Sequence, residues 1–133
     1  MALTEDRQTP YQDAEILSVP VAASTKIFAG ALVAANATGY AQGGAAATTL
    51  TYLGRAEEQV DNSAGVDGDL NIKVRRGKAF KFKNSGTDAV TQAELGKSCY
   101  IEDDETVAKT DGTGTLSACG KVVGIEGNFV WVE

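Results

Sequence analysis

The sequence predicts a mainly β fold: a single small β-sandwich or barrel with an extended N-terminal arm and one short helical turn. Turn signals recur at roughly ten-residue spacing and separate short β-prone runs. Apolar and polar residues alternate strictly over residues 70–75 and again over residues 79–83, which is typical of half-buried strands. A Gly127-Asn128 pair then joins two β-prone runs at the C-terminus and predicts a hairpin.

The length of 133 residues suggests one domain, with an arm over residues 1–15 and a β domain over residues 16–133. A chain of this size buries roughly two-thirds of its unfolded surface, which is enough for an ordinary core. No apolar run reaches the ~20 residues of a membrane-spanning helix. The acidic, polar N-terminus is not expected to be a signal peptide.

The composition bears on the class of function. A net charge of −6 and a sequence pI near 4.6 argue against binding to nucleic acids or anionic membranes. The chain has no histidine, so the commonest general base and the commonest zinc ligand are missing. We therefore expect no enzyme, no cofactor and no metal. Cys99 and Cys119 could pair, but in a chain without an export signal we expect reduced thiols.

Residues 1–15 are polar and show no apolar period. Thr9 and Pro10 favour an extended backbone, so the segment is either an arm that grips a neighbour or a disordered terminus. In the first case Leu3 and Tyr11 are the apolar anchors, and Arg7 offers a forked donor for a carboxylate. We accordingly assign Leu3, Arg7, Pro10 and Tyr11 as contact residues toward another copy or a larger assembly.

Residues 16–21 predict the first strand, and Pro20 places it at a sheet edge or a strand end. Residues 26–35 are ambiguous, because their alanines suit a helix. Gly30 and the turn predicted over residues 36–39 favour strands instead.

Residues 43–48 are small and predict a loop with nothing to contribute to packing. Strand alternation resumes over residues 49–53, and a turn follows at residues 61–65. Residues 91–94 fit a capping box, with Thr91 as N-cap and Glu94 reaching back, so a helix of about one turn is expected before Gly96.

Residues 98–102 predict a strand with Cys99 and Ile101 on one face. Asp103 and Asp104 then turn the chain into a strand over residues 106–109. Another turn is expected at residues 110–114.

Six of the twelve basic residues fall between Lys73 and Lys83, and we call this set the basic ridge. The two alternating runs around residues 76–78 form either one bent strand or a hairpin. The ridge is either a solvated face with lysines guarding an edge, or a docking surface for an acidic protein patch. Nucleic acid is less favoured, because the aromatics here share the buried parity and cannot stack on bases. The ridge consists of Lys73, Arg75, Arg76, Lys78, Lys81 and Lys83, of which Arg75, Arg76 and Lys78 are assigned as candidate contacts.

The closing hairpin has a defined register if Gly127-Asn128 forms a type II′ turn. One side of the ribbon is then wholly aliphatic, and on the other a tryptophan ring covers a glycine. The expected pairs are Ile125 with Val130, Val123 with Val132, Gly124 with Trp131, and Glu126 with Phe129.

Three groups of residues are candidates for a chemical site. Residues 102–105 with Asp111 form the best calcium candidate, but they lack the oxygen spacing of an EF-hand loop. Residues 112–114 lack the strand-to-helix context of a phosphate loop. Glu57 and Glu58 are expected at a surface strand end. None of the three predicts an active site.

Segments spread along the whole chain resemble one family. They are Ala2-Leu3-Thr4-Glu5-Asp6-Arg7 with Thr9-Pro10, residues 27–34, Gly39-Tyr40-Ala41, Gly54-Arg55-Ala56-Glu57-Glu58 with Val60-Asp61-Asn62, residues 96–101, Asp103-Asp104 and residues 106–110. Together these segments resemble the small head-decoration, or minor capsid, proteins of Mu-like tailed bacteriophages.

The resemblance implies a mainly β structural protein, made in the cytoplasm of the bacterial host and located in the virion on the outer capsid surface. Such a cement protein bridges and stabilises neighbouring subunits of the major capsid protein, often as a homotrimer, and has no catalytic residues. The alternative is a β-rich fibre, tail-tip or carbohydrate-binding module. That function needs exposed aromatics on loops, for which Tyr11, Tyr40 and Tyr52 are the available tyrosines.

Overall fold

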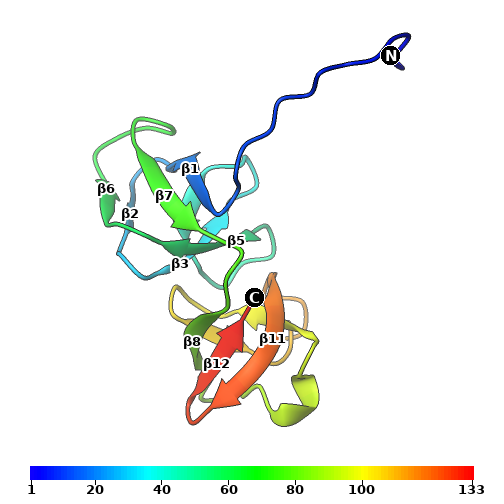
Figure 1. The fold of residues 1–133 in the computed structure, drawn as a ribbon. Helices are drawn as coiled ribbons and strands as arrows, with labels where there is room; N and C mark the ends of the chain where they lie inside the picture. Colours follow the sequence, from blue (N-terminus) through cyan, green and yellow to red (C-terminus); the bar gives the residue numbers. More distant parts are fainter.

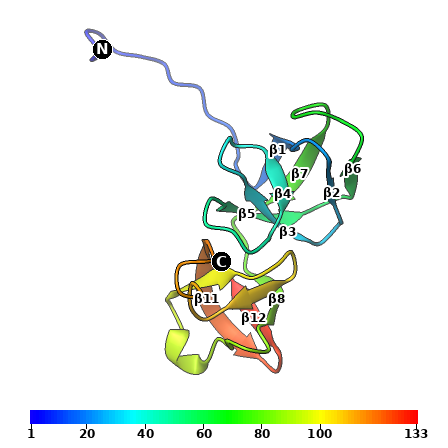
Figure 2. The ribbon, with the colours of Figure 1, turned by 180° about the vertical axis from the view of Figure 1, so that it is seen from behind.

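The computed structural model describes all 133 residues as an extended arm and two stacked β units (Figures 1 and 2). The first, the sheet unit, is a five-stranded sheet of order β1-β7-β5-β3-β4, flanked by a β2–β6 ribbon. The second, the barrel unit, is closed in the order β10-β8-β12-β11-β9. The predicted fold class, mainly β with a barrel and one short helical turn, is confirmed.

The elements follow one another with short connections. Their bounds are β1 Ile16–Pro20, β2 Thr25–Ile27, β3 Leu32–Ala35, β4 Ala41–Gly43, β5 Thr51–Ala56, β6 Val60–Asn62, β7 Asn71–Arg75, β8 Phe80–Asn84, η1 Gln92–Glu94, β9 Ser98–Ile101, β10 Thr106–Ala108, β11 Ala118–Glu126 and β12 Phe129–Val132. As predicted, β1 is an edge strand that ends at Pro20, and it pairs only with β7.

Strand β3 lies between two hydrophobic cores and is buried on both faces. Leu32 and Ala34 belong to the barrel core, whereas Ala31 and Val33 belong to the core of the sheet unit. A strand buried on both sides needs no polar alternation. This explains why residues 26–35 were ambiguous in sequence, although the favoured strand interpretation is confirmed.

The expectation that residues 43–48 have nothing to pack is wrong. Gly44 is buried, and its N–H donates to the carbonyl of Leu32 at 2.8 Å. A Cβ on Gly44 would lie 2.6 Å from the carbonyl oxygen of Asp103 and 2.8 Å from Cγ2 of Ile101. Ala45 and Ala47 pack against the barrel core. Small residues are therefore needed here, because the loop joins the two units at close backbone approach.

Strands β7 and β8 do not form the hairpin that the sequence left open. β7 pairs with β1 and β5 in the sheet unit, whereas β8 pairs with β10 and β12 in the barrel. The residues between them cross from one unit to the other, with Gly77 at φ 75°. The shared parity is real, because Ile72 and Val74 are buried in one core while Phe80 and Phe82 are buried in the other.

The short elements around β9 match their predictions. The Glu94 carboxylate accepts hydrogen bonds from the N–H of Thr91 at 2.7 Å and from its hydroxyl at 2.5 Å, which makes the expected return contact at the start of η1. Cys99 and Ile101 are both fully buried on one face of β9. The chain then turns at residues 103–105 into β10.

The closing hairpin has three of its four predicted pairs: Gly124 with Trp131, Ile125 with Val130, and Glu126 with Phe129. Gly127 has φ 59° while Asn128 has no positive φ, as a type II′ turn requires. The predicted pairing of Val123 with Val132 is wrong. A bulge between Val122 and Gly124 places Val122 opposite Val132 and turns Val123 outward, where it is exposed.

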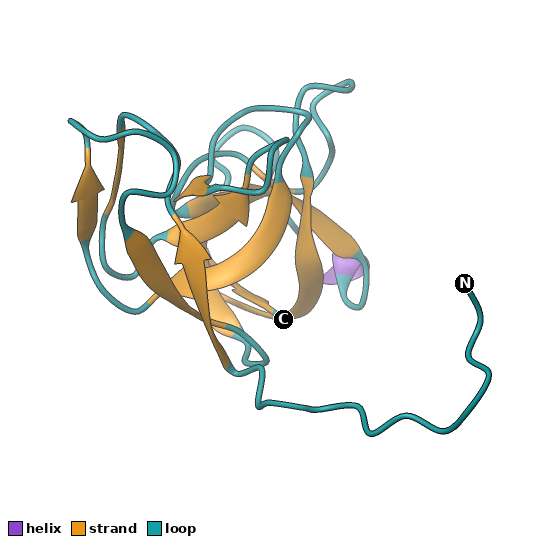
Figure 3. Cartoon of the chain, turned by 90° about the horizontal axis from the view of Figure 1, so that it is seen from above, coloured by secondary structure: helices purple, strands orange, loops and turns teal.

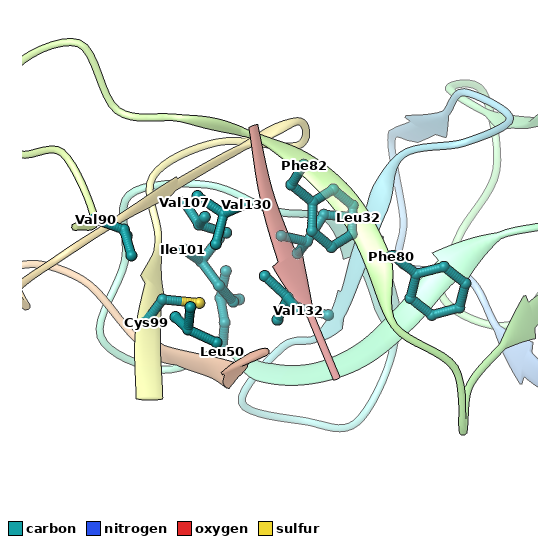
Figure 4. Packing of buried hydrophobic residues seen from close by; sticks show 12 residues of the cluster. Leu32, Leu50, Phe80, Phe82, Val90, Cys99, Ile101, Val107, Val130 and Val132 are labelled. Atoms are coloured by element: carbon teal, nitrogen blue, oxygen red, sulfur yellow. The ribbon is translucent and has the colours of Figure 1, made fainter. Parts of the chain in front are cut away.

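The barrel core gathers apolar side chains from both units (Figure 4). The sheet unit supplies part of this core, so the two stacked units share an apolar interface. Its members are Leu32, Ala34, Leu50, Phe80, Phe82, Val90, Cys99, Ile101, Val107, Val122, Val130 and Val132.

Candidate interaction surfaces

The N-terminal arm projects away from the body in every view (Figures 1 to 3). No hydrogen bond or ion pair joins residues 1–14 to the rest of the chain. Leu3 and Tyr11 are 72% and 97% exposed, and Arg7 donates only to the hydroxyl of Thr9, at 3.0 Å. The assigned anchors are therefore free to contact another molecule.

The root of the arm lies against the middle of the basic ridge. The N–H of Arg76 donates to the carbonyl of Glu15 at 2.8 Å, and Nζ of Lys78 lies 3.8 Å from Oε1 of Glu15. Ile16 pairs with Arg75 across β1 and β7. The structure thus brings Arg75, Arg76 and Lys78 together at the arm's root. The other four assigned residues, Leu3, Arg7, Pro10 and Tyr11, lie along the arm.

The ridge is not one continuous positive surface. Two of its lysines extend from β8 of the barrel, where Lys81 pairs with Glu126 at 2.7 Å and Lys83 with Glu105 at 2.8 Å. Arg76 makes no ion pair, and the partner of Lys78 is 3.8 Å away. Lys73 in β7 also makes no ion pair, so the positive charge available for docking lies in β7 and at the crossing between the two units.

Arg75 itself is held by a neighbour that the sequence did not suggest. Arg55 and Arg75 are direct partners across β5 and β7, an arrangement that repels. The half-buried Glu57 carboxylate ion-pairs with both guanidinium groups, at 2.8 Å from Nε of Arg75. Glu57 follows the end of β5, as predicted, but it serves as a bridge between two arginines. Arg55 also lies over the ring of Phe80, with 5.1 Å to the centroid.

We expect the Glu57 bridge to make stability depend on acid pH. Hydrogen bonds from Arg75 and Arg55 lower the pKa of Glu57 in the folded chain. Its contribution is complete above the unfolded pKa of about 4.3 and is lost as the pH falls through the lower folded value. In urea denaturation, Glu57→Gln should lower the midpoint at pH 7, and the difference from wild type should shrink below about pH 4. Glu5→Gln on the arm is the control, and a pH-independent difference for Glu57→Gln would contradict the bridge.

An aromatic surface on the outside of the barrel was missed in sequence. Nζ of Lys81 lies 4.8 Å from the ring centroid of Phe129 and 5.9 Å from that of Trp131. Trp131 covers Gly124, where a Cβ would lie 3.4 Å from Cδ1 of the indole. The predicted hairpin register already put both rings on the face opposite the aliphatic side. That register was the signal that could have found this surface.

Phe129 also borders a hollow of ≈ 520 Å³ at one end of the barrel. The side-chain amide of Asn84 donates to the carbonyl of Val90 at 2.9 Å and accepts from the N–H of Val90 at 2.8 Å. The hydroxyl of Ser85 donates to Glu102 at 2.6 Å. The hollow therefore offers an exposed ring and the Asn128 amide, while the polar groups of Asn84 and Ser85 are already used.

Phe28 is a further exposed aromatic residue, with 54% of its surface accessible. Nζ of Lys26 lies 5.1 Å from its ring centroid. Of the tyrosines that a carbohydrate surface could use, Tyr11 is exposed on the arm and Tyr40 is half-buried. Tyr52 packs against the barrel core, and its hydroxyl is buried without a hydrogen-bond partner. Tyr52 is thus not a loop aromatic.

The acidic run at residues 102–105 does not converge on one point. Glu102 accepts from Ser85, the Asp103 carboxylate accepts from the N–H of Glu105 at 2.9 Å, and Glu105 pairs with Lys83. Burial raises the pKa of Asp104. No group of three or more histidine, cysteine, aspartate or glutamate residues lies in an arrangement that could hold a metal ion.

No protein-family model, curated protein or solved structure matches the chain. The structure contains no helix with the length and apolar character needed to span a membrane.

Proposed function

We propose that the chain is a decoration, or cement, protein of a bacteriophage capsid. In this proposal it binds the outside of the head, bridges neighbouring subunits of the major capsid protein and assembles with itself, as a homotrimer. The observation that supports it most directly is the arm: Leu3 and Tyr11 are exposed, and no hydrogen bond or ion pair holds residues 1–14 to the body. The arm also contains Thr4-Glu5-Asp6-Arg7, one of the segments that resemble the family.

The energetics of the arm favour a role in contact with a partner. Ordering backbone costs roughly 1–2 kcal/mol per residue, and the chain's own body offers the arm no compensating contacts. Burial of Leu3 and Tyr11, or addition of the arm as a strand to a partner sheet, would offset that cost. A ligand that binds only the assembled shell stabilises it by mass action, which is how a cement protein acts.

Quantitative mass spectrometry of purified particles tests the proposal. A copy number close to that of the major capsid protein is expected for a decoration protein. Heads without the chain, or with only a few copies, would refute the proposal.

The exposed rings Phe28 and Phe129 favour one alternative, a carbohydrate-binding or fibre module. Each ring has a lysine within about 5 Å of its centroid, and Phe129 borders a hollow. A few copies per particle, together with retention on an oligosaccharide column that Phe129→Ala abolishes, would favour this alternative.

We expect charge reversal at the root of the arm to weaken capsid binding. Arg76→Glu with Lys78→Glu is the sharpest change, because neither residue holds the Arg55–Glu57–Arg75 bridge. Binding of wild type should weaken as salt rises, since exposed charges are screened over ~8–10 Å at ordinary ionic strength. The variant should bind more weakly and depend less on salt in a co-sedimentation assay with undecorated heads.

The matched control is Lys97→Glu with Lys109→Glu, which reverses two exposed charges of the barrel unit that lie near Glu94 of η1. The Arg76→Glu, Lys78→Glu variant could occupy heads as well as wild type does, or the two double variants could lose the same occupancy. Either result would show that the basic ridge is a solvated face and not a docking surface.

A further inference from the structure

The two cysteines oppose each other across neighbouring strands of the barrel. β9 and β11 pair Tyr100 with Ala118 and Ser98 with Lys121, so Cys119 and Gly120 together lie opposite Cys99. This is a β-bulge, with two residues on one strand facing one on the other. The thiol of Cys99 donates to the carbonyl of Gly120 at 3.4 Å.

Both thiols belong to the same side of the sheet. Cys99 is a fully buried member of the barrel core, and Cys119 packs against that core. The hydrogen bond with the neighbouring Cys99 thiol and burial raise the pKa of Cys119. The hydroxyl of Tyr52 is also close to both sulfurs and has no hydrogen-bond partner. Two free thiols are therefore held side by side in an apolar region.

We propose that Cys99 and Cys119 are a latent modification site that forms an intrachain disulfide when the folded chain meets a low-molecular-weight disulfide such as oxidised glutathione. The spacing of neighbouring antiparallel strands supports this. Cα atoms of directly opposed residues lie about 4.5–5.5 Å apart, within the range of about 4.4–6.8 Å that a disulfide spans. At this bulge Cys119 shares the position opposite Cys99 with Gly120, and the hydrogen bond between the two thiols places their side chains against each other. The disulfide therefore needs little movement of the backbone.

The reaction proceeds by two exchanges. Cys119, the less buried of the two, loses its proton to solvent and attacks one sulfur of oxidised glutathione, which releases one glutathione thiolate. Cys99 then loses its proton and attacks the Cys119 sulfur of the mixed disulfide, which releases the second thiolate. The two cysteines are oxidised, one glutathione disulfide is reduced, and both thiolates take up protons to give two molecules of reduced glutathione.

The environment of the pair makes this reaction slow in the native state. The thiolate is the nucleophile, and the raised pKa of Cys119 keeps its population small at neutral pH. The first half of β11 is also tied to the C-terminal residue, because Lys121 and Glu133 exchange two backbone hydrogen bonds, at 3.1 and 2.9 Å. The same structure therefore predicts free thiols in a reducing compartment. It predicts a disulfide after the protein is released into an oxidising one.

The bond would close a loop that runs from Cys99 in β9 through β10 to Cys119 at the start of β11. In the chain-entropy model a loop of about 20 residues gives a stabilisation that corresponds to a rise of roughly 10 °C in melting temperature for a domain of this size. The effect does not depend on the proposed function.

The test incubates the purified, reduced full chain with a glutathione redox buffer, both natively and through a cycle of unfolding and refolding so that slow access cannot hide the bond. The expected product is a monomer lighter by two hydrogen atoms, whose digest contains a Cys99–Cys119 linked peptide. It should melt roughly 10 °C above the same chain after reduction. Cys119→Ala is the control, and its melting temperature should be the same in oxidising and reducing buffer.

Three results would overturn the proposal. They are free thiols after the refolding cycle, a stable glutathione adduct on Cys119 without the intrachain bond, and a covalent dimer as the main product.

Discussion

Replacing Gly54 with alanine is expected to destabilise the chain by about 3 kcal/mol or more. Gly54 lies in β5 at φ +151°, a conformation that residues with a Cβ rarely adopt. A Cβ there would also lie 2.1 Å from the carbonyl oxygen of Arg75 and 3.3 Å from Cγ1 of Val74. The backbone of β7 would have to move, and the pairing of Arg55 with Arg75 would be lost. Urea denaturation measured by circular dichroism gives the loss directly.

Two further glycines separate the causes of that loss. Gly86 has an ordinary φ and open space around its Cβ position, so Gly86→Ala should change stability by no more than about 0.5 kcal/mol. Gly30 has φ +84° and equally open space, so Gly30→Ala should show the backbone cost alone, about 1 kcal/mol. If Gly54→Ala were as stable as Gly86→Ala, the close approach of β5 to β7 would be refuted.

Deleting residues 2–12 is expected to abolish or strongly reduce assembly while the β body stays folded. The segment makes no hydrogen bond or ion pair with the body, so its loss removes none that hold the two cores. The circular dichroism spectrum and the urea midpoint should match those of the full chain. Light scattering should show a smaller oligomer, and occupancy on heads should fall.

A second pair of variants identifies what the arm contributes. Leu3→Ala with Tyr11→Ala removes the exposed apolar anchors and should reproduce most of the effect of the deletion. Gln8→Ala alters the same segment without removing an anchor, and it should assemble as the wild type does. Normal assembly and decoration by the truncated chain would make the arm a loose terminus.

The strands that the sequence predicted best are those with one face in a core. In β7, Ile72 and Val74 alternate with exposed residues, and the C-terminal hairpin revealed its register through a glycine turn. β3 gave no alternation because both of its faces are buried. The loop at residues 43–48 was misjudged because small side chains look featureless in sequence, whereas here they allow two backbones to approach.

The candidate surfaces were predictable only in part. A polar segment with Pro10 and no apolar period indicated an arm, and the structure extends it into solvent. The charge of the ridge was visible in sequence, but its neutralisation was not. Glu105 and Glu126, the partners of Lys83 and Lys81, lie more than twenty residues away along the chain. Composition cannot reveal contacts of that separation.

The position of β3 between the two cores has a consequence for synthesis of the protein. During translation the sheet unit leaves the ribosome first, with Leu32, Ala34 and Leu50 already present but without β8 to β12 to cover them. Until the last residues emerge, this nascent half exposes an apolar face that a chaperone or a second nascent chain can bind. The final strand β12 contributes Val130 and Val132 to the same core, so completion of the barrel waits for the end of the chain. Folding of the two units is therefore coupled. In a chain that is terminated within β11 or β12, the sheet unit and the barrel unit would both be prone to aggregation and proteolysis.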